Sequence, residues 1–241
     1  MSRRVQEWMI ILFCSGALLV MAMLPEVWDN WAKQAFPGIT ATSYPGTSLL
    51  QLLEEHLLLV GASSLIAVAL GIGLGIYVTR PYGREYLETA HDISAIAQTF
   101  PPVAVIALAV PALGFGYKPT ILALFLYGIL PILKNTIAGL EDVSPDVIEA
   151  AQGLGMSPIQ VLRRVEVPLA LNVIIAGIRT SVIVNIGTAT VGAAFGAGGL
   201  GGPIIAGLVR DNPALILQGA VPVALMAISA DLLLAQLERS V

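Results

Sequence analysis

Long apolar segments recur along the whole sequence, and they constrain the fold more than any other feature. An apolar stretch of about 17 to 25 residues crosses a bilayer as a helix, because a helix satisfies its own backbone hydrogen bonds where water is absent. Charged residues make up only 12% of the chain, against about 25% in an average soluble domain. We therefore predict an all-α fold, a polytopic membrane helical bundle of about six transmembrane helices. The segments are residues 8–24, 57–78, 93–113, 119–133, 170–195 and 213–236.

Prolines interrupt the third and fourth of these segments. Residues 101–113 are too short to cross alone, so residues 93–99 are expected to complete the third crossing, with a break at Pro101 and Pro102 inside the membrane. The fourth segment contains Pro131. Interrupted helices at membrane depth are tolerated mainly where they face protein or a polar cavity. Both segments are therefore candidates for lining a pathway.

Local signals predict where two of the helices begin. Ser48 and Gln51 have the spacing of a capping box, so the second helix is expected to start near Leu49. Asn212 and Pro213 stand at the capping and first helical positions of the last helix. Small residues let membrane helices approach closely. Three glycines of the second segment are expected to permit such close packing. These are Gly71, Gly73 and Gly75.

The distribution of basic residues predicts the orientation. Six crossings put both termini on one side, and cytoplasmic loops carry an excess of Lys and Arg. With both termini in the cytoplasm, the inside residues are Arg3, Arg4, Arg80, Arg84, Lys134, Arg163, Arg164 and Arg239, and the outside residues are Lys33, Lys118 and Arg210. The first segment is also compatible with a cleaved signal peptide. We favour a retained anchor, because the apolar stretch is long for a signal and no A-x-A-like site follows it.

Several function classes find no support in the sequence. The net charge of −4 and the scattered basic residues give no footprint for nucleic acid. Cys14 is the only cysteine, and His56 and His91 stand alone and are expected to be solvated or interfacial, so no metal site is predicted. The chain lacks the G-x-x-x-x-G-K-[ST] pattern that cradles ATP, and the G-x-G-x-x-G match at residues 196–201 lacks a βαβ context. We expect no catalytic residue and no cofactor in this chain.

The polar stretch between the fourth and fifth segments carries two helix-start signals. Ser144 precedes a proline and an acid, and Ser157 precedes a proline with Gln160 completing a capping box. Gly153 and Gly155 lie between the two signals, where glycine permits the left-handed backbone that ends a helix. We predict two short helices joined by a tight corner. Such a corner suits insertion into a groove on another protein, although an ordinary loop has the same local signals.

The residues of this loop, 134–168, resemble a known signature. Glu149, Ala150 and Ala151, then Gly155 after three residues, and finally Pro168 reproduce the E-A-A, x3, G, spacer, P pattern of bacterial ABC importer permeases. The resemblance implies a type I ABC importer permease fold in which this loop binds a cytoplasmic ATPase subunit. The residues that it assigns to ATPase coupling are Glu149, Ala150, Ala151, Gly153, Gly155, Met156, Ser157 and Pro168.

Further stretches resemble permeases for glycine betaine, choline or carnitine. They are QTFPP, YGILPILKNT, GIRT, GAGGLG and DLLL, at residues 98–102, 127–136, 177–180, 196–201 and 231–234. Permeases for methionine are similar over the loop and the glycine-rich stretch, so an amino-acid importer is the alternative. The resemblance covers residues 49–241 and leaves residues 1–48 as an N-terminal transmembrane helix and external loop.

The resemblance also implies partners and a location. The permease would pair with a second permease subunit, either an identical copy or a close paralogue, within the lipid of a bacterial cytoplasmic membrane. Two ATPase subunits would bind ATP and Mg²⁺, and an external solute-binding protein would deliver the solute. Two rivals remain from other classes: a self-sufficient secondary transporter or channel, and a purely structural membrane anchor.

Candidate pathway residues combine polar, aromatic and glycine positions. They are Tyr127, Asn185, Thr188, Phe195, Gly196, Gly198, Gly199 and Gly201. The simpler interpretations are helix–helix hydrogen bonds, ordinary packing and a flexible outer loop. Arg179 and Asp231 occupy comparable depths, and lone charges there would each cost about 2.5 to 3.5 kcal/mol. We expect the two to pair.

Overall fold

The computed structural model describes residues 3–97 and 99–240, and these residues form helices without any strand. Gln98 of the QTFPP stretch lies outside the described residues. The α-helices are α1 (Arg3–Met23), α2 (Pro25–Ala35), α3 (Leu49–Thr79), α4 (Leu87–Ala97), α5 (Pro102–Leu113), α6 (Tyr117–Glu141), α7 (Pro145–Gly153), α8 (Pro158–Val161), α9 (Val167–Gly192), α10 (Gly201–Val209) and α11 (Pro213–Ser240). Short turns of helix are η1 (Arg84–Tyr86), the π-helical η2 (Leu162–Glu166) and η3 (Ala193–Phe195). The predicted all-α class is confirmed.

Among the described residues, five helical stretches are long and apolar enough to cross a membrane. They are Val5–Met23, Leu49–Thr79, Tyr117–Glu141, Pro158–Phe195 and Pro213–Ser240. A sixth crossing requires counting Arg84–Ala97 and Pro102–Leu113 as one span, and these two are bent by 97°. The predicted break at Pro101 is therefore present, and it is a corner between two helices that point in different directions.

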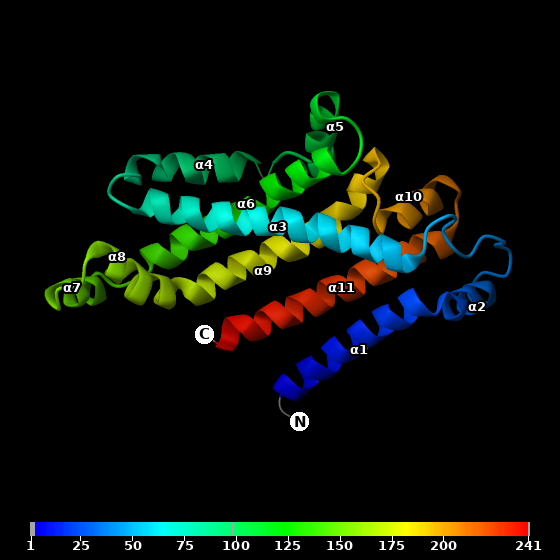
Figure 1. The fold of residues 1–241 in the computed structure, drawn as a ribbon, viewed down its shortest axis with the longest axis horizontal. Helices are drawn as coiled ribbons and strands as arrows, with labels where there is room; N and C mark the ends of the chain where they lie inside the picture. Colours follow the sequence, from blue (N-terminus) through cyan, green and yellow to red (C-terminus); the bar gives the residue numbers. More distant parts are fainter. Residues whose placement is uncertain (1–2, 98, 241) are drawn as a thin grey trace.

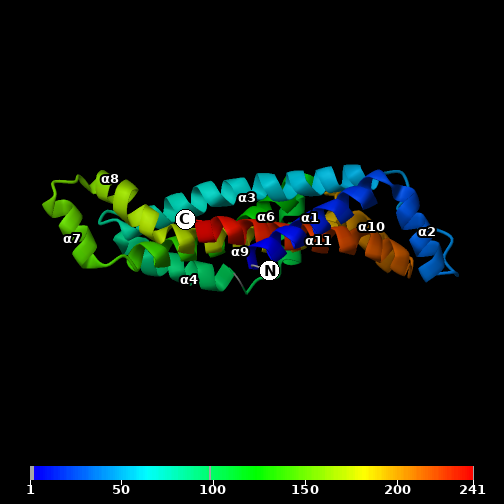
Figure 2. The ribbon, with the colours of Figure 1, turned by 90° about the horizontal axis from the view of Figure 1, so that it is seen from below.

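The long helices run side by side and form one elongated bundle (Figure 1). Helices α3, α6 and α9 make the central packing, α11 lies against α9, and α1 lies against α11. The largest core cluster joins Leu59 and Val60 of α3, Leu124 of α6 and Ile186 of α9. Helices α7 and α8 project from one end of the bundle, and α2 and α10 cover the other (Figure 2). The end of α11 points toward α7 and α8, and α1 starts near the middle of the length of the bundle and runs toward α2 (Figure 1).

Small residues set the distance between α3 and α6, as predicted for two of the three glycines. A methyl group added at Gly71 would lie 2.8 Å from a side-chain carbon of Ile132, and one at Gly75 would lie 2.6 Å from Thr136. The same group at Gly73 would meet nothing within 4 Å. Gly73 is therefore not part of this contact.

Both predicted helix starts are confirmed. The backbone N–H of Gln51 donates to the Ser48 hydroxyl at 3.2 Å, and the Gln51 side chain accepts from the Ser48 backbone, which completes the capping box of α3. The backbone N–H of Leu215 donates to Asn212 Oδ1 at 3.2 Å at the start of α11. These bonds satisfy backbone donors that the first turn of a helix leaves free.

The prediction for His56 was wrong. Its side chain is 0% exposed within α3, and its Nε2 lies 3.0 Å from the carbonyl oxygen of Ile186 on α9. The other histidine, His91, is exposed on α4, as expected. His56 is buried because α9 and the outer segment that follows it pack over this part of α3, a long-range contact that the local sequence does not encode.

The loop between α1 and α3 is folded and held by hydrogen bonds and apolar contacts. It contains α2, whose Trp28 packs with Ala32 against Ala214 of α11. The indole N–H of Trp28 donates to the Thr42 carbonyl at 2.8 Å, and Thr42 and Ser43 both donate to Asp29. This loop therefore forms an ordered cap over the end of the bundle opposite α7 and α8.

Candidate functional site

The two helices of the 134–168 loop form a projecting corner, which we call the elbow (residues 145–161). Ser144 occupies the capping position of α7 without a side-chain hydrogen bond to that helix. At the second start the backbone N–H of Ser157 donates to Gln160 Oε1 at 2.8 Å. Gly155 lies between them with φ +81°, a left-handed conformation that glycine adopts at no steric cost. Ser157, Gln160 and Gly155 therefore act as predicted, and Ser144 marks the start of α7 without bonding to it.

The second helix of the elbow is not a separate short helix. α8 continues through the π-helical turn η2 into α9, so that residues 158–195 form one candidate span. This corrects the prediction of two short helices, because the chain passes Pro168, which has no backbone N–H to donate, by way of the π-helical turn η2 and does not end the helix there. The elbow is thus joined to the membrane-spanning α9 without a flexible linker.

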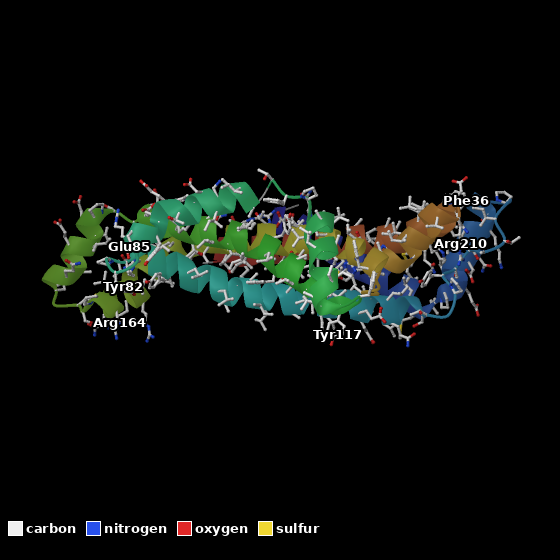
Figure 3. The ribbon with its side chains drawn as sticks, turned by 90° about the horizontal axis from the view of Figure 1, so that it is seen from above. Phe36, Tyr82, Glu85, Tyr117, Arg164 and Arg210 are labelled. Carbon is white, nitrogen blue, oxygen red and sulfur yellow. The ribbon has the colours of Figure 1, made fainter. Side chains whose placement is uncertain are left out.

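The outer surface of the elbow is free of contacts within the described chain. Leu154 at the tip is 81% exposed, and Ile159 is 52% exposed. Of the residues assigned to ATPase coupling, Ala151 is buried against the elbow itself and Met156 is half-buried. The exposed members are Glu149, Ala150, Gly153, Gly155, Ser157 and Pro168. Pro168 lies outside the elbow, and Arg164 in η2 projects at the same end of the molecule (Figure 3).

The structure also shows an ion pair beneath the elbow that the sequence analysis did not identify. Arg80, directly after α3, donates from Nη1 to Glu166 Oε2 at 2.7 Å. The two side chains are only 18% and 7% exposed. An acid two residues before the signature proline Pro168 was the available signal, but its partner lies 86 positions away along the chain.

Two of the candidate pathway residues are held inside the bundle by hydrogen bonds. Asn185 is 0% exposed, and its amide donates to the Ser64 hydroxyl of α3 at 3.1 Å. A methyl group added at Gly128 of α6 would lie 2.8 Å from this amide. The Tyr127 hydroxyl donates to the Phe100 carbonyl and so ties α6 to the corner before α5. Asn185 therefore makes a hydrogen bond between two helices, which is the simpler alternative to a role in the pathway.

Tyr127 also lines an apolar cavity of about 490 Å³ between α4 and the α3–α6 pair. Leu74, Ile93 and Leu133 contribute to its wall. The structure thus places Tyr127 at this cavity and Asn185 at the contact between α3 and α9. Thr188 is half-buried on α9, one turn beyond Asn185.

The remaining pathway candidates come together beyond the end of α9 that is remote from the elbow, in what we call the glycine segment (residues 196–201) and at Phe195 just before it. Gly196, Gly198 and Gly199 all have positive φ, at +80°, +79° and +73°. The Gly116 N–H donates to the Phe195 carbonyl at 2.7 Å just before this segment. A methyl group at Gly201 would overlap the Thr190 carbonyl oxygen. At these four positions of the segment the backbone therefore requires glycine.

A carboxylate of α3 fastens the glycine segment. The Gly199 N–H donates to Glu55 Oε2 at 2.7 Å. His56, the next residue of α3, lies against Gly199 as well, with Nδ1 3.1 Å from the place a methyl group would take there. Neither Glu55 nor His56 was singled out from the sequence as a contact of these glycines, because nothing local relates them.

The two charges expected to pair are in contact. Arg179 Nε lies 2.5 Å from Asp231 Oδ1, and Arg179 Nη1 lies 3.2 Å from Glu238 Oε2. Glu238 was missed, although its separation of seven residues from Asp231 puts the two acids on one face of α11. No group of three or more His, Cys, Asp or Glu in the described residues is arranged to hold a metal ion.

Comparisons with known proteins agree with this architecture. Residues 71–241 match the family described as "Binding-protein-dependent transport system inner membrane component". The carnitine transport permease protein OpuCD of Listeria monocytogenes is 40% identical over 196 residues, 81% of this chain and 87% of the relative. The choline transport system permease protein OpuBB of Bacillus subtilis is 42% identical over 80% of this chain and 88% of its own length. The osmoprotectant import permease protein OsmY of Salmonella typhimurium is 44% identical over 84% and 86%.

Solved structures show the same fold. The MetNI methionine ABC transporter, in an inward-facing conformation, contains a chain that superposes with a TM-score of 0.70 at 22% identity. The match covers 80% of this chain and 95% of that one. An amino acid ABC transporter with histidines matches with a TM-score of 0.65 at 20% identity, over 80% and 94%. At such identities the likeness concerns the fold alone.

Proposed function

Because the chain belongs to the family of binding-protein-dependent transport system inner membrane components, we propose that it forms the path by which a quaternary-ammonium compatible solute enters the cell. The solute class is that of glycine betaine, choline and carnitine. The one observation that carries this assignment is the 40 to 44% identity to permeases named for carnitine, choline and osmoprotectants, over about four fifths of the chain. Methionine import is the alternative, and the methionine transporter shares only 22% identity.

The elbow is the proposed binding site for a cytoplasmic ATPase subunit. Its exposed residues form a compact helical surface at the end of the bundle, and Leu154 at its tip is 81% exposed. A tip that carries an apolar side chain fits a groove on another protein better than it fits water. ATP and Mg²⁺ would be held by that partner, since the sequence contains no phosphate-cradling motif. This chain would then do no covalent chemistry.

The remaining partners follow from the family. A second permease subunit would complete the pathway within the membrane, and an external binding protein would deliver the solute to the end that carries α2 and α10. The start of α1 and the end of α11 are the ends of these two helices that face the elbow, which supports placing both termini in the cytoplasm of a bacterial cell. The basic residues Arg163 and Arg164 beside the elbow agree with that orientation.

Transport in this proposal depends on two conformations that each partner stabilises to a different degree. Closure of the ATPase subunits would displace the elbow, and α9 would move with it because no flexible linker separates them. The glycine segment at the outer end of α9 would then open or seal the path. A quaternary ammonium can pass aromatic faces by cation–π attraction without a buried carboxylate, and Phe195 and Tyr127 supply such faces beside the presumed path.

The test is solute-stimulated ATP hydrolysis by the complex of this chain with its ATPase and binding protein in liposomes. We expect glycine betaine, choline or carnitine to stimulate hydrolysis together with uptake, and methionine to have no effect. Stimulation by methionine alone would favour the amino-acid alternative. Solute uptake by liposomes that lack the ATPase subunit would favour a secondary transporter.

A further inference from the structure

The ion pair between Arg80 and Glu166 joins two parts of the chain that a displacement of the elbow would otherwise separate. Arg80 ends α3, and Glu166 is the last residue of the π-helical turn between α8 and α9. The 2.7 Å bond is largely shielded from solvent, since the two side chains are 18% and 7% exposed. Breaking a shielded pair leaves a charge without a partner, which is strongly unfavourable. The end of α3 is therefore held to the base of the elbow.

The helix at this point departs from regular geometry. Residues 162–166 form a π-helical turn near the start of the 158–195 span. Such turns are rare, and they occur frequently at functional sites. Glu166 is placed by this turn with 5% of its surface exposed, facing the end of α3. The irregular turn thus coincides with the contact between the elbow and α3.

Grooves that are partly open to solvent lie on both sides of the ion pair. One cavity of about 290 Å³ is lined by Arg80, Glu166, Leu140 and Ile148 of α7. A second of about 380 Å³ is lined by the same pair and by Ile148 and Ile159 of the elbow. Ile148 is half-buried and Ile159 is 52% exposed. The ion pair is therefore a firm polar contact beside two grooves in which the apolar side chains of the elbow have room to move.

The other end of α3 makes the second firm contact. Glu55 lies in the second turn of α3 and accepts the N–H of Gly199 in the glycine segment at 2.7 Å. Helix α3 has 31 residues, or about 46 Å at a rise of about 1.5 Å per residue. It has no proline within it and runs the length of the bundle without a break (Figure 1). One stiff element thus connects the base of the elbow with the outer glycine segment.

We propose that α3 is a rigid link between the elbow and the glycine segment, and we call it the connecting rod. Its inner joint is the ion pair between Arg80 and Glu166. Its outer joint is the hydrogen bond from the Gly199 N–H to Glu55. Arg80, Glu166 and Glu55 are positioning residues: they transmit a displacement of the elbow to the glycine segment and touch neither ATP nor solute. This inference rests on the proposed function, because it names how the ATPase would control the outer end of the path. α9 supplies the covalent connection between the same two places, and α3 supplies the second.

The experiment measures solute taken up per ATP hydrolysed by the complete complex in liposomes. The inner joint is removed with Arg80→Gln, with Glu166→Gln and with both changes together. Only the double variant leaves no buried charge without a partner. The outer joint is removed with Glu55→Ala, and Glu55 is exposed, so this change leaves the fold intact. The matched control is the double variant Glu7→Gln, Arg239→Gln, which removes a 2.9 Å ion pair between α1 and α11, away from both joints.

If α3 couples the two sites, the amount of solute taken up per ATP hydrolysed should fall by about five-fold or more in the Arg80, Glu166 and Glu55 variants. A change of this size is typical of coupling between two sites. The control should keep the wild-type ratio. Arg80→Lys, Glu55→Gln and the exchange Arg80→Glu with Glu166→Arg keep the bonds and should restore the ratio. An unchanged ratio in Glu55→Ala, or in the assembled double variant of the inner joint, overturns the proposal. An equal fall of this ratio in the control variant would also overturn the proposal.

The failure of this inference differs from a failure of the proposed function. If the wild-type complex shows no hydrolysis stimulated by quaternary amines, the proposed function is wrong. If the wild-type complex responds and the joint variants transport as much per ATP, only the rod is wrong. Where Arg80→Gln or Glu166→Gln alone does not assemble, the exchange variant and Glu55→Ala decide the question.

Discussion

Arg179 of α9 and Asp231 of α11 face each other with Nε 2.5 Å from Oδ1, and Glu238 approaches the same guanidinium at 3.2 Å. One cation therefore serves two acids, which are separated by about two helical turns of α11. Each of the first two side chains is 33% exposed. The cluster lies between two membrane-spanning helices, where an unpaired charge is costly.

Exchanging the two charges tests this relationship. Arg179→Gln should lower the amount of chain inserted in the membrane more than Asp231→Asn, because it leaves two acids without a cation, whereas Asp231→Asn leaves Arg179 paired with Glu238. The exchange of Arg179→Asp with Asp231→Arg should recover much of that amount, since the two positions would again face each other with opposite charges. Quantitative blotting of isolated membranes gives the measurement. A double variant that inserts no better than the single ones would show that the pair does not matter.

Gly155 and Gly153 form a matched pair within the elbow. Gly155 has φ +81°, whereas Gly153 is helical, and a methyl group at either position meets nothing within 4 Å. Gly155→Ala should cost about 1 to 2 kcal/mol through the backbone alone and weaken binding of the ATPase subunit. Gly153→Ala adds the same methyl group to a helical backbone, so it should weaken binding less than Gly155→Ala does. The affinity of purified permease for the ATPase subunit tests both, and equal affinity for the two variants would count against the assigned elbow geometry.

A second matched pair lies on α3. Gly75→Ala would push a methyl group to 2.6 Å from Thr136 on α6, whereas Gly73→Ala would meet nothing. Overpacking of this kind costs about 1 to 3 kcal/mol. The thermal midpoint of the purified protein in detergent should therefore fall for Gly75→Ala and stay the same for Gly73→Ala. A fall of equal size in both would contradict the assigned α3–α6 contact, because the change from Gly to Ala by itself favours a helix.

Gly198 tests the hold of α3 on the glycine segment. A methyl group there would overlap Glu55 Oε2, on a backbone with φ +79°. The carboxylate must move away, and Gly199 then loses its acceptor. We expect Gly198→Ala to lower solute uptake and to have little further effect in a chain that already carries Glu55→Ala. Fully additive losses in the double variant, measured as initial uptake rates, would indicate that the two residues act separately.

Local patterns in the sequence predicted the helices well. The apolar runs identified the long spans, and Ser48 and Asn212 marked two helix starts, because caps and apolar periodicity depend on neighbours along the chain. The elbow was found through its capping signals and through Gly155, whose left-handed backbone is a local property. The family signature added the expected role of the elbow.

Apart from the pair of Arg179 and Asp231, contacts between distant residues were not predictable. Arg80 and Glu166 are 86 positions apart, and Glu55 and Gly199 are 144 apart, so no local rule relates them. The burial of His56 depends on α9, whose contacting residue is 130 positions away. The 97° corner before α5 and the continuous path from α8 into α9 depend on how the helices pack. The second acid beside Arg179 is the exception, since its spacing along α11 could have been noticed.

The central claim is that the elbow contacts an ATPase on the cytoplasmic side. Leu154→Cys in a Cys14→Ser background places a single thiol at the elbow tip, since Cys14 is the only native cysteine and Leu154 is 81% exposed. In inside-out vesicles this thiol should react with a membrane-impermeant maleimide, and bound ATPase subunit should protect it and cross-link to it. Reaction only in right-side-out vesicles, or a thiol that the ATPase subunit neither protects nor cross-links, would contradict the account.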